Sequence, residues 1–221
     1  MFRDRADAAQ QLAARFERIP LQRPIVLAVP RGGVALGAPL ARILVAELDV
    51  VLARKLRAPF QPELAVGSVA ETGHTFVNES VARSTEATAE YLAEEKAFQL
   101  GEIERRKKLF RGVRPPADLT DRTVIVTDDG IATGATMLAA LQSIRLQHPR
   151  EIILAVPVAA PGRLRPLQKW CDRVICLDEP ATFWSVGQFY KNFTQLEDAD
   201  VVALLQDSAS GGLPSGIRHR E

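Results

Sequence analysis

Short apolar runs recur along this chain, and segments with helical spacing separate most of them. The runs are rich in Val, Ile and Leu and lie at 24–30, 49–55, 123–128, 151–159 and 172–177. Helices are expected at about 4–19, 34–46, 84–111, 135–147, 163–170, 187–193 and 197–206. Continuous apolar strands that alternate with helices are typical of parallel sheets covered on both faces. The chain is therefore predicted to form an α/β fold with a mostly parallel central sheet and helices on both faces.

Two segments depart from this alternation. At 64–78, strand-like pieces flank Glu-Thr-Gly-His, a pattern that predicts a hairpin. At 208–221 the sequence has no apolar periodicity, so we expect a disordered tail.

Composition and charge argue against several classes of protein. The formal net charge of +1 predicts no general attraction to nucleic acid or to a membrane surface. No window is apolar enough for a membrane helix, and the charged N-terminus is unlike a signal peptide. Two cysteines and three scattered histidines do not suit a zinc site or a disulfide framework, which favours a cytoplasmic location. The basic run at 105–111 is interpreted as a solvated helix face.

The segment TVIVTDDGIATGATM (123–137) carries the strongest chemical signal. An apolar strand ends in Asp128 and Asp129, whose charges repel, and a loop of small residues follows. Gly130 and Gly134 let the backbone approach a ligand closely. The loop opens a helix near Ala135, and the start of a helix favours a phosphate group.

The two ends of this loop suit two parts of one ligand. Carboxylates accept hydrogen bonds from a vicinal diol and can lie near a divalent cation. Unpaired amides and threonine hydroxyls over 132–136 suit a phosphate. The pattern therefore predicts a sugar-phosphate site, with plain turn chemistry of Asp-Asp-Gly as the alternative.

Two further polar segments follow predicted strands. Arg31, Gly32 and Gly33 come after the run at 24–30, and Arg54 with Lys55 ends the run at 49–55. Because ligands bind at the carboxyl ends of parallel strands, we expect these segments to converge with the aspartate loop. The alternatives are a tight turn for Arg-Gly-Gly and surface charge for Arg54 and Lys55.

The stretch VIVTDDGIATGAT resembles the phosphoribosyl diphosphate (PRPP) loop of type I phosphoribosyltransferases. The resemblance implies a type I fold with its core at about 24–178, within one domain at 1–207. It implies a long helical insertion at about 79–112 that is either a lid or a dimer contact, and a small hood at about 178–207. Family analogy also implies a homodimer.

By this resemblance, Asp128 and Asp129 bind the ribose hydroxyls and act in catalysis. The ribose-phosphate loop would comprise those two residues with Gly130, Ala132, Thr133, Gly134, Ala135 and Thr136. The pyrophosphate would be bound by Arg31, Gly32, Gly33, Arg54 and Lys55. The implied reaction is transfer of the phosphoribosyl group from PRPP to a nitrogenous base in nucleotide salvage. Mg²⁺ would be held mainly by PRPP and water, near the aspartates, with no dedicated protein cage.

The acceptor base is open at this level. Ala132 stands where hypoxanthine–guanine members carry an acid, which argues against a 6-oxopurine and leaves another purine as one option. Glu71 is a candidate catalytic acid on a mobile loop, or a plain residue of the hairpin tip. Phe183 and Trp184 are candidates for stacking on the base, or part of a small satellite core.

Two other functions remain as alternatives. One is a non-catalytic regulator that senses PRPP or a nucleotide with the same fold. The other is a different α/β phosphate binder, although the chain lacks both G-x-G-x-x-G and G-x-x-x-x-G-K-[ST].

Overall fold

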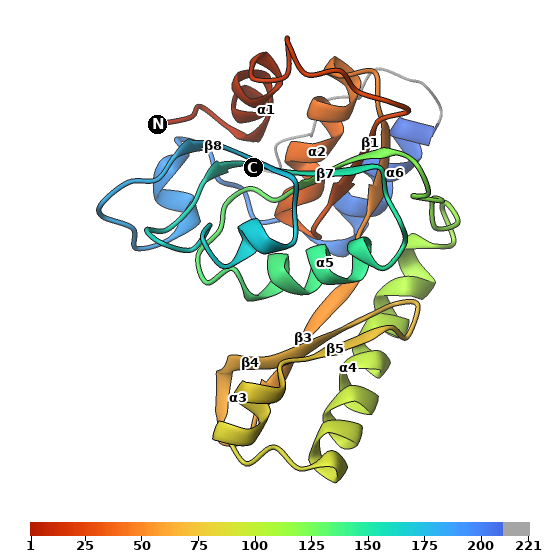
Figure 1. The fold of residues 1–221 in the computed structure, drawn as a ribbon. Coiled ribbons are helices and arrows are strands. Elements are labelled where there is room, and N and C mark those ends of the chain that lie inside the picture. The colour runs from red at the N-terminus through yellow and green to blue at the C-terminus, as the bar shows by residue number, and fades with distance from the viewer. Residues whose placement is uncertain (210–221) are drawn as a thin grey trace.

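The computed structural model describes residues 1–209 and has a five-stranded parallel sheet at its centre (Figure 1). The strand order is β2-β1-β6-β7-β8. The strands are β1 (Ile25–Ala28), β2 (Glu47–Val50), β6 (Thr123–Thr127), β7 (Glu151–Val158) and β8 (Arg173–Asp178). Every neighbouring pair is parallel, so all five carboxyl ends lie at one edge of the sheet. The predicted fold class is confirmed.

Helices cover both faces of this sheet. Ile125 and Ile153 pack on the face covered by α1 (Arg5–Ala14), α2 (Gly32–Ile43) and α6 (Asp198–Ala209). Their neighbours Val124 and Ile152 pack on the opposite face, against α5 (Ala135–Arg145). Because both faces are buried, β6 and β7 are apolar almost throughout instead of alternating with polar residues.

A second lobe extends from the side of the parallel sheet (Figure 1). It contains the antiparallel strands β3 (Ala53–Ala58), β4 (Gln61–Ala70) and β5 (Thr75–Val77). It also contains α3 (Glu79–Ser84) and the long α4 (Ala89–Phe110). The Thr88 side chain caps the start of α4 by accepting a hydrogen bond from the Tyr91 amide. The hairpin predicted at 64–78 is confirmed as β4 and β5.

The prediction of one strand at 49–55 is wrong. β2 ends at Val50, and β3 begins at Ala53 in the other sheet. Val51 and Leu52 are buried between the two strands, so the apolar pattern continues while the chain changes sheets. Arg54 and Lys55 consequently lie inside β3 and do not follow β2.

Three predicted helical or disordered segments also differ. The segment 163–170 holds only the 3₁₀ turn η1 (Leu167–Lys169), and 187–193 overlaps only the 3₁₀ turn η2 (Val186–Phe189). Pro166 is the fourth residue of the segment 163–170, where it removes the amide that would donate the first hydrogen bond of a longer helix and its ring crowds the preceding turn. Residues 208 and 209 belong to α6, while 210–221 of the predicted tail lie outside the described residues. Within 1–209, no helix has the length and apolar character required to cross a membrane.

Candidate active site

The loops that follow β1 and β6 touch each other at the carboxyl edge of the sheet. A Cβ atom added to Gly32 would lie 1.9 Å from Oδ2 of Asp129, and one added to Gly33 would lie 2.9 Å from the Thr127 carbonyl oxygen. The approach is possible because neither glycine has a side chain. The Pro30–Arg31 peptide bond in this loop is cis. The predicted convergence of Arg31-Gly32-Gly33 with the aspartate loop is therefore present in the fold.

Asp129 is buried and held by residues from both ends of the chain. Arg5 donates from Nε and Nη2 to Oδ2 of Asp129, at 2.9 and 2.8 Å. The Tyr190 hydroxyl donates to the Asp129 carbonyl oxygen at 2.6 Å. The Arg5 guanidinium also lies over the Phe193 ring, 4.0 Å from its centroid. Sequence reasoning missed Arg5 and Tyr190, because neither belongs to a strand-end motif.

Asp128 has a different environment from its neighbour. Its side chain makes no ion pair among the described residues, and its Oδ1 accepts a hydrogen bond from the Asp129 amide at 2.8 Å. Burial raises the pKa of Asp128 well above the ordinary aspartate value, and the charge of Asp129 raises it further. Hydroxyl donors or a cation placed against Asp128 would stabilise its charged form. Of the two predicted acids, Asp128 is thus the one whose carboxylate remains available to a ligand.

The small-residue loop after Asp129 is open to solvent where a phosphate would bind. Ala132, Thr133 and Thr136 are exposed. Gly134 has a φ of 80°, a left-handed conformation that favours glycine, and α5 begins at the next residue. The Thr133 hydroxyl is the acceptor for the Ala135 amide at 3.4 Å, a long contact that an anion could replace. The loop therefore offers amides, hydroxyls and the positive end of α5.

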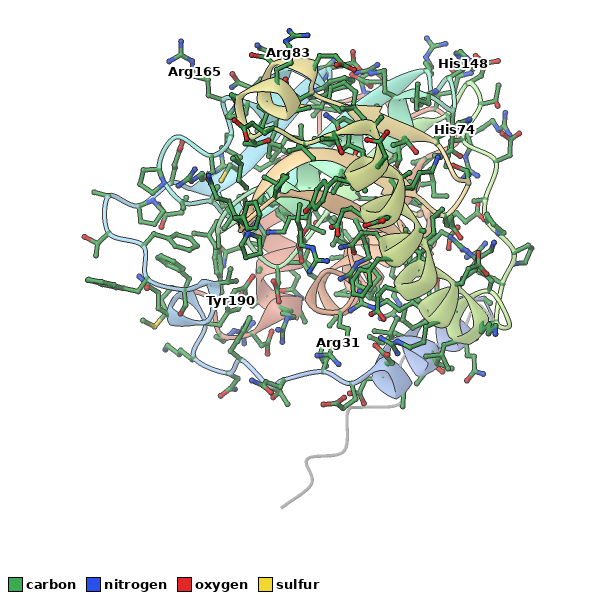
Figure 2. All side chains as sticks on the ribbon, turned by 90° about the horizontal axis from the view of Figure 1, so that it is seen from below. Arg31, His74, Arg83, His148, Arg165 and Tyr190 are labelled. Carbon is green, nitrogen blue, oxygen red and sulfur yellow. The ribbon has the colours of Figure 1, made fainter. Side chains whose placement is uncertain are left out.

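The predicted pyrophosphate residues are divided between two positions. Arg31 is the cap residue just before α2 and points toward the segment that leads into α6, where it pairs with Glu197 at 3.3 Å (Figure 2). Arg54 is half-buried in β3 and donates to Oε1 of Gln99 at 2.5 Å. Arg54 also shares the lining of a small pocket with Pro30 and Thr136, so it adjoins both loops. Lys55, the next residue of β3, does not line that pocket.

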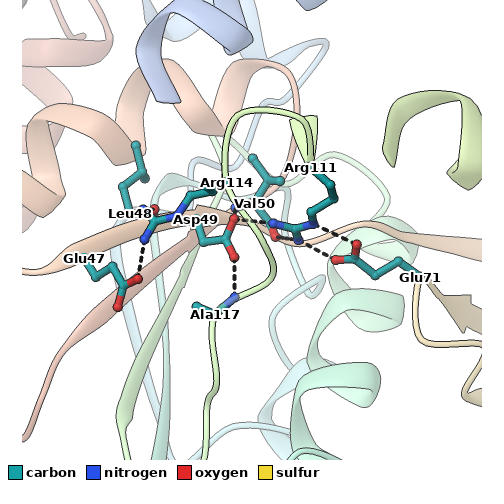
Figure 3. A network of polar contacts seen from close by, with 8 residues as sticks. All are labelled: Glu47, Leu48, Asp49, Val50, Glu71, Arg111, Arg114 and Ala117. Atoms are coloured by element: carbon teal, nitrogen blue, oxygen red, sulfur yellow. Dashed lines mark hydrogen bonds and ion pairs between the residues drawn. The ribbon is translucent and has the colours of Figure 1, made fainter. Parts of the chain in front are cut away.

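Glu71 lies in a buried ion-pair network that includes no residue of the aspartate loop. Arg111 donates from Nε and Nη2 to the two carboxylate oxygens of Glu71, and from Nη1 to Asp49 at 2.6 Å (Figure 3). The second oxygen of Asp49 accepts the Ala117 amide at 3.0 Å. Arg114 donates to Glu47 and to the Leu48 carbonyl in the same region. The network joins the end of α4 to β2 and fastens the second lobe to the core.

The predicted aromatic residues lie in the loop before η2. The Trp184 side chain is 86% exposed, while the Phe183 ring packs 5.2 Å from that of Phe189. Phe189 and Phe193 pack against the main core together with Tyr190. Trp184 is therefore the aromatic of this loop that is open to an incoming ring.

The interpretation of the basic run at 105–111 as a solvated helix face is wrong at two charged positions. Arg111 is enclosed by the network above, and Arg106 faces inward. These residues continue the buried stripe of α4, in which Gln99 and Ile103 precede them at helical spacing. The spacing of Ile103 and Phe110 indicates this buried side in the sequence, but the density of charge in the run concealed that Arg106 and Arg111 lie on it as well.

Comparison with known proteins identifies the family. A family model described as "Phosphoribosyl transferase domain" matches residues 2–194. The chain belongs to this family. Within the phosphoribosyl transferase family, the loop of Asp128 and Asp129 is the segment whose sequence resembles the PRPP loop.

Individual relatives agree with this assignment. The chain is 43% identical over 205 residues to the Mycobacterium tuberculosis protein named "Putative phosphoribosyl transferase Rv0571c". That match covers 93% of this chain and 46% of the relative, so the chain spans about half the length of the curated relatives it matches. The crystal structure of TT1426 from Thermus thermophilus superposes with a TM-score of 0.88 at 41% identity, covering 93% of this chain and 98% of that one.

Proposed function

We propose that this protein transfers the 5-phosphoribosyl group of PRPP to a nitrogenous base and releases pyrophosphate. A bond forms between a ring nitrogen of the base and C1 of the ribose, the bond from C1 to the diphosphate oxygen breaks, and the base loses a proton. The observation that carries the proposal is the contact between the glycine loop after β1 and the aspartates after β6. That contact brings together one loop suited to a diphosphate and one suited to a ribose 5-phosphate.

In this proposal each loop has a separate task. Asp128 accepts hydrogen bonds from the ribose hydroxyls, and the loop from Ala132 to Thr136 binds the 5-phosphate through amides and hydroxyls. Arg31 and the backbone of Gly32 and Gly33 receive the diphosphate. Asp129 holds the loop in place and does not bind the ligand directly, because Arg5 already donates two hydrogen bonds to its Oδ2 atom. These contacts fix C1 for attack from the side opposite the diphosphate.

Mg²⁺ fits this arrangement as an ion carried by the ligand. Among residues 1–209, no three His, Cys, Asp or Glu side chains are grouped to hold a metal. Mg²⁺ is commonly bound by substrate phosphates, water and one or two carboxylates, and Asp128 supplies a carboxylate without a protein cation as partner. When bound, the ion would neutralise charge that develops on the departing diphosphate.

The acceptor side of the proposal rests on the C-terminal loop. Trp184 presents an exposed aromatic surface suited to a flat base such as a purine, and the neighbouring Phe183 packs on Phe189. Glu71 receives no catalytic role in this proposal, because Arg111 engages both of its oxygens. Nucleotide salvage in the cytoplasm and a homodimeric state remain parts of the proposal that rest on family analogy.

The experiment is a pyrophosphate-release assay with PRPP, Mg²⁺ and a panel of purine and pyrimidine bases. We expect turnover with at least one base, and a loss of about 100-fold or more in kcat/KM for Asp128→Asn. The matched control is Asp121→Asn, the same chemical change at an exposed residue before β6. PRPP binding by calorimetry without turnover on any base would instead support the non-catalytic sensor of PRPP or nucleotide.

A further inference from the structure

Arg106 is a half-buried cation whose Nε atom is shielded from solvent and has no hydrogen-bond partner within residues 1–209. An arginine is rarely placed this way, because a desolvated charge costs free energy unless an anion compensates it. Burial lowers the pKa of Arg106, and the nearby charge of Arg54 lowers it further. The Asp198 carboxylate acts in the opposite direction and compensates part of this cost.

The surroundings of Arg106 connect it to both loops of the candidate active site. Arg106 lines one small pocket together with Pro30, Arg54 and Thr136. Pro30 precedes the glycine loop after β1, and Thr136 belongs to the proposed phosphate loop. Arg106 comes from α4, one turn after the buried Ile103, so its backbone is fixed by the core. A rigid element thus presents a guanidinium between the two anion-binding loops.

Acidic residues at the start of α6 neutralise the arginines of this region. Glu197 pairs with Arg31 at 3.3 Å, and Oδ2 of Asp198 pairs with Arg105 at 3.5 Å. Oδ1 of Asp198 is buried and has no partner among the described residues, like Nε of Arg106. Asp198 acts electrostatically on Arg106 without a hydrogen bond between them. The two carboxylates therefore provide negative charge near the arginines, but within residues 1–209 the donor Nε of Arg106 and the acceptor Oδ1 of Asp198 remain without hydrogen bonds.

The small volume of the pocket and the weakness of the ion pairs both indicate that a ligand would replace these carboxylates. The pocket beside Arg106 has a volume of about 20 Å³, which admits a water molecule but not a diphosphate. Both ion pairs to α6 involve partly exposed arginines, with 43% and 55% of the side-chain surface accessible. Exposed ion pairs contribute little stability, so opening them costs little.

We propose that Arg106 is a binding residue for the diphosphate group, and that Glu197 and Asp198 are internal counter-ions displaced when the diphosphate binds. This inference rests on the proposed function and adds a residue and an exchange step to it. A diphosphate carries more charge and more acceptor oxygens than two carboxylates, and it would satisfy the orphaned Nε of Arg106. The carboxylates of α6 then keep the arginine cluster compensated while no ligand is bound.

The test is calorimetric titration with inorganic pyrophosphate in the presence of Mg²⁺. We expect Arg106→Met to weaken binding about tenfold or more, and Lys108→Ala, a charge lost from an exposed site on the same helix, to change it less than about twofold. Asp198→Asn should tighten binding, and this gain should vanish in the Arg106→Met background. Equal effects of Arg106→Met and Lys108→Ala would overturn the proposal, because they would indicate only long-range attraction.

Two further measurements separate the possible failures. Thermal unfolding should show Arg106→Met to be about as stable as wild type, because Nε loses no hydrogen bond and Asp198 keeps Arg105 as its partner. A marked loss of stability would indicate a structural role and contradict the proposal. Titration with ribose 5-phosphate probes the other loop and should be unaffected by Arg106→Met. If ribose 5-phosphate binds and Arg106→Met has the same pyrophosphate affinity as wild type, this inference fails and the proposed function stands. If neither ligand binds, both fail.

Discussion

Arg5 and Asp129 are 124 positions apart in the sequence and form the ion pair that closes the candidate active site. Two guanidinium nitrogens of Arg5 converge on one carboxylate oxygen, and the side chains are only 10% and 12% exposed. The same guanidinium donates to the Thr194 carbonyl oxygen at 3.0 Å. One arginine near the N-terminus thus connects the aspartate loop with the C-terminal segment.

Loss of Arg5 should destabilise the protein strongly. In Arg5→Met, Asp129 remains buried without its cation, which typically costs about 3–5 kcal/mol in the free energy of unfolding. Urea denaturation of wild type, Arg5→Met, Asp129→Asn and the double variant measures this coupling. We expect the double variant to recover part of the loss, and strictly additive effects would show that the two residues do not interact.

Gly32→Ala should disrupt the site through one added methyl group. The new Cβ would lie 1.9 Å from Oδ2 of Asp129, which Arg5 prevents from moving away. We expect a stability loss of about 1–3 kcal/mol and a loss of PRPP binding. Gly101→Ala is the control, because a Cβ there meets no atom within 4 Å inside α4 and should raise stability by about 0.5–1 kcal/mol. Unchanged PRPP affinity in Gly32→Ala would contradict the contact between the loops.

Asp128→Asn should stabilise the protein in a pH-dependent manner while it weakens PRPP binding. Because the folded-state pKa of Asp128 is raised, the native state holds this proton more tightly than the unfolded chain. Native stability therefore falls as pH rises from the ordinary aspartate range, about 4, through the raised pKa, and then levels off. The variant lacks this loss, so its advantage should grow over the same window and disappear below it. A pH-independent difference between the two unfolding curves would argue against the raised pKa.

Arg111→Met should loosen the second lobe from the core. The change leaves Asp49, which is 2% exposed, and Glu71 without their cation, at a cost of about 3–5 kcal/mol. Hydrogen exchange should accelerate at β2 and at the end of β4.

Glu71→Gln tests the alternative role of Glu71: we expect lower stability with kcat retained in the folded protein. A fall in kcat of about 100-fold at unchanged stability would assign Glu71 to acid–base catalysis.

Trp184→Ala should separate base recognition from folding. The side chain is 86% exposed, so the free energy of unfolding should change by less than about 0.5 kcal/mol. The KM for the base should rise several-fold if the ring stacks on it, while the KM for PRPP stays constant. Phe189→Ala is the contrasting variant, because that ring packs against the core and its loss should lower stability.

The sequence alone determined the fold class and singled out the central loop as the candidate site. Buried parallel strands must be apolar along their whole length, so the runs that became β1, β6, β7 and β8 were visible without a structure. The same periodicity could not separate β2 from β3, because burial continues through Val51 and Leu52 where the chain changes sheets. Asp128 to Thr136 stood out because small residues and paired acids conflict with ordinary packing.

Tertiary structure decided which charged side chains face one another. Arg5, Arg106 and Arg111 look alike in the sequence. Arg5 pairs with Asp129, Arg111 joins Asp49 to Glu71, and the buried Nε of Arg106 has no partner within residues 1–209. Their partners lie on elements that meet only after the sheet and the second lobe have assembled. Local sequence patterns indicate which face of an element is buried. The energy of a charged side chain depends instead on its distance in space to charges that are far away in the sequence, and on the exclusion of water between them.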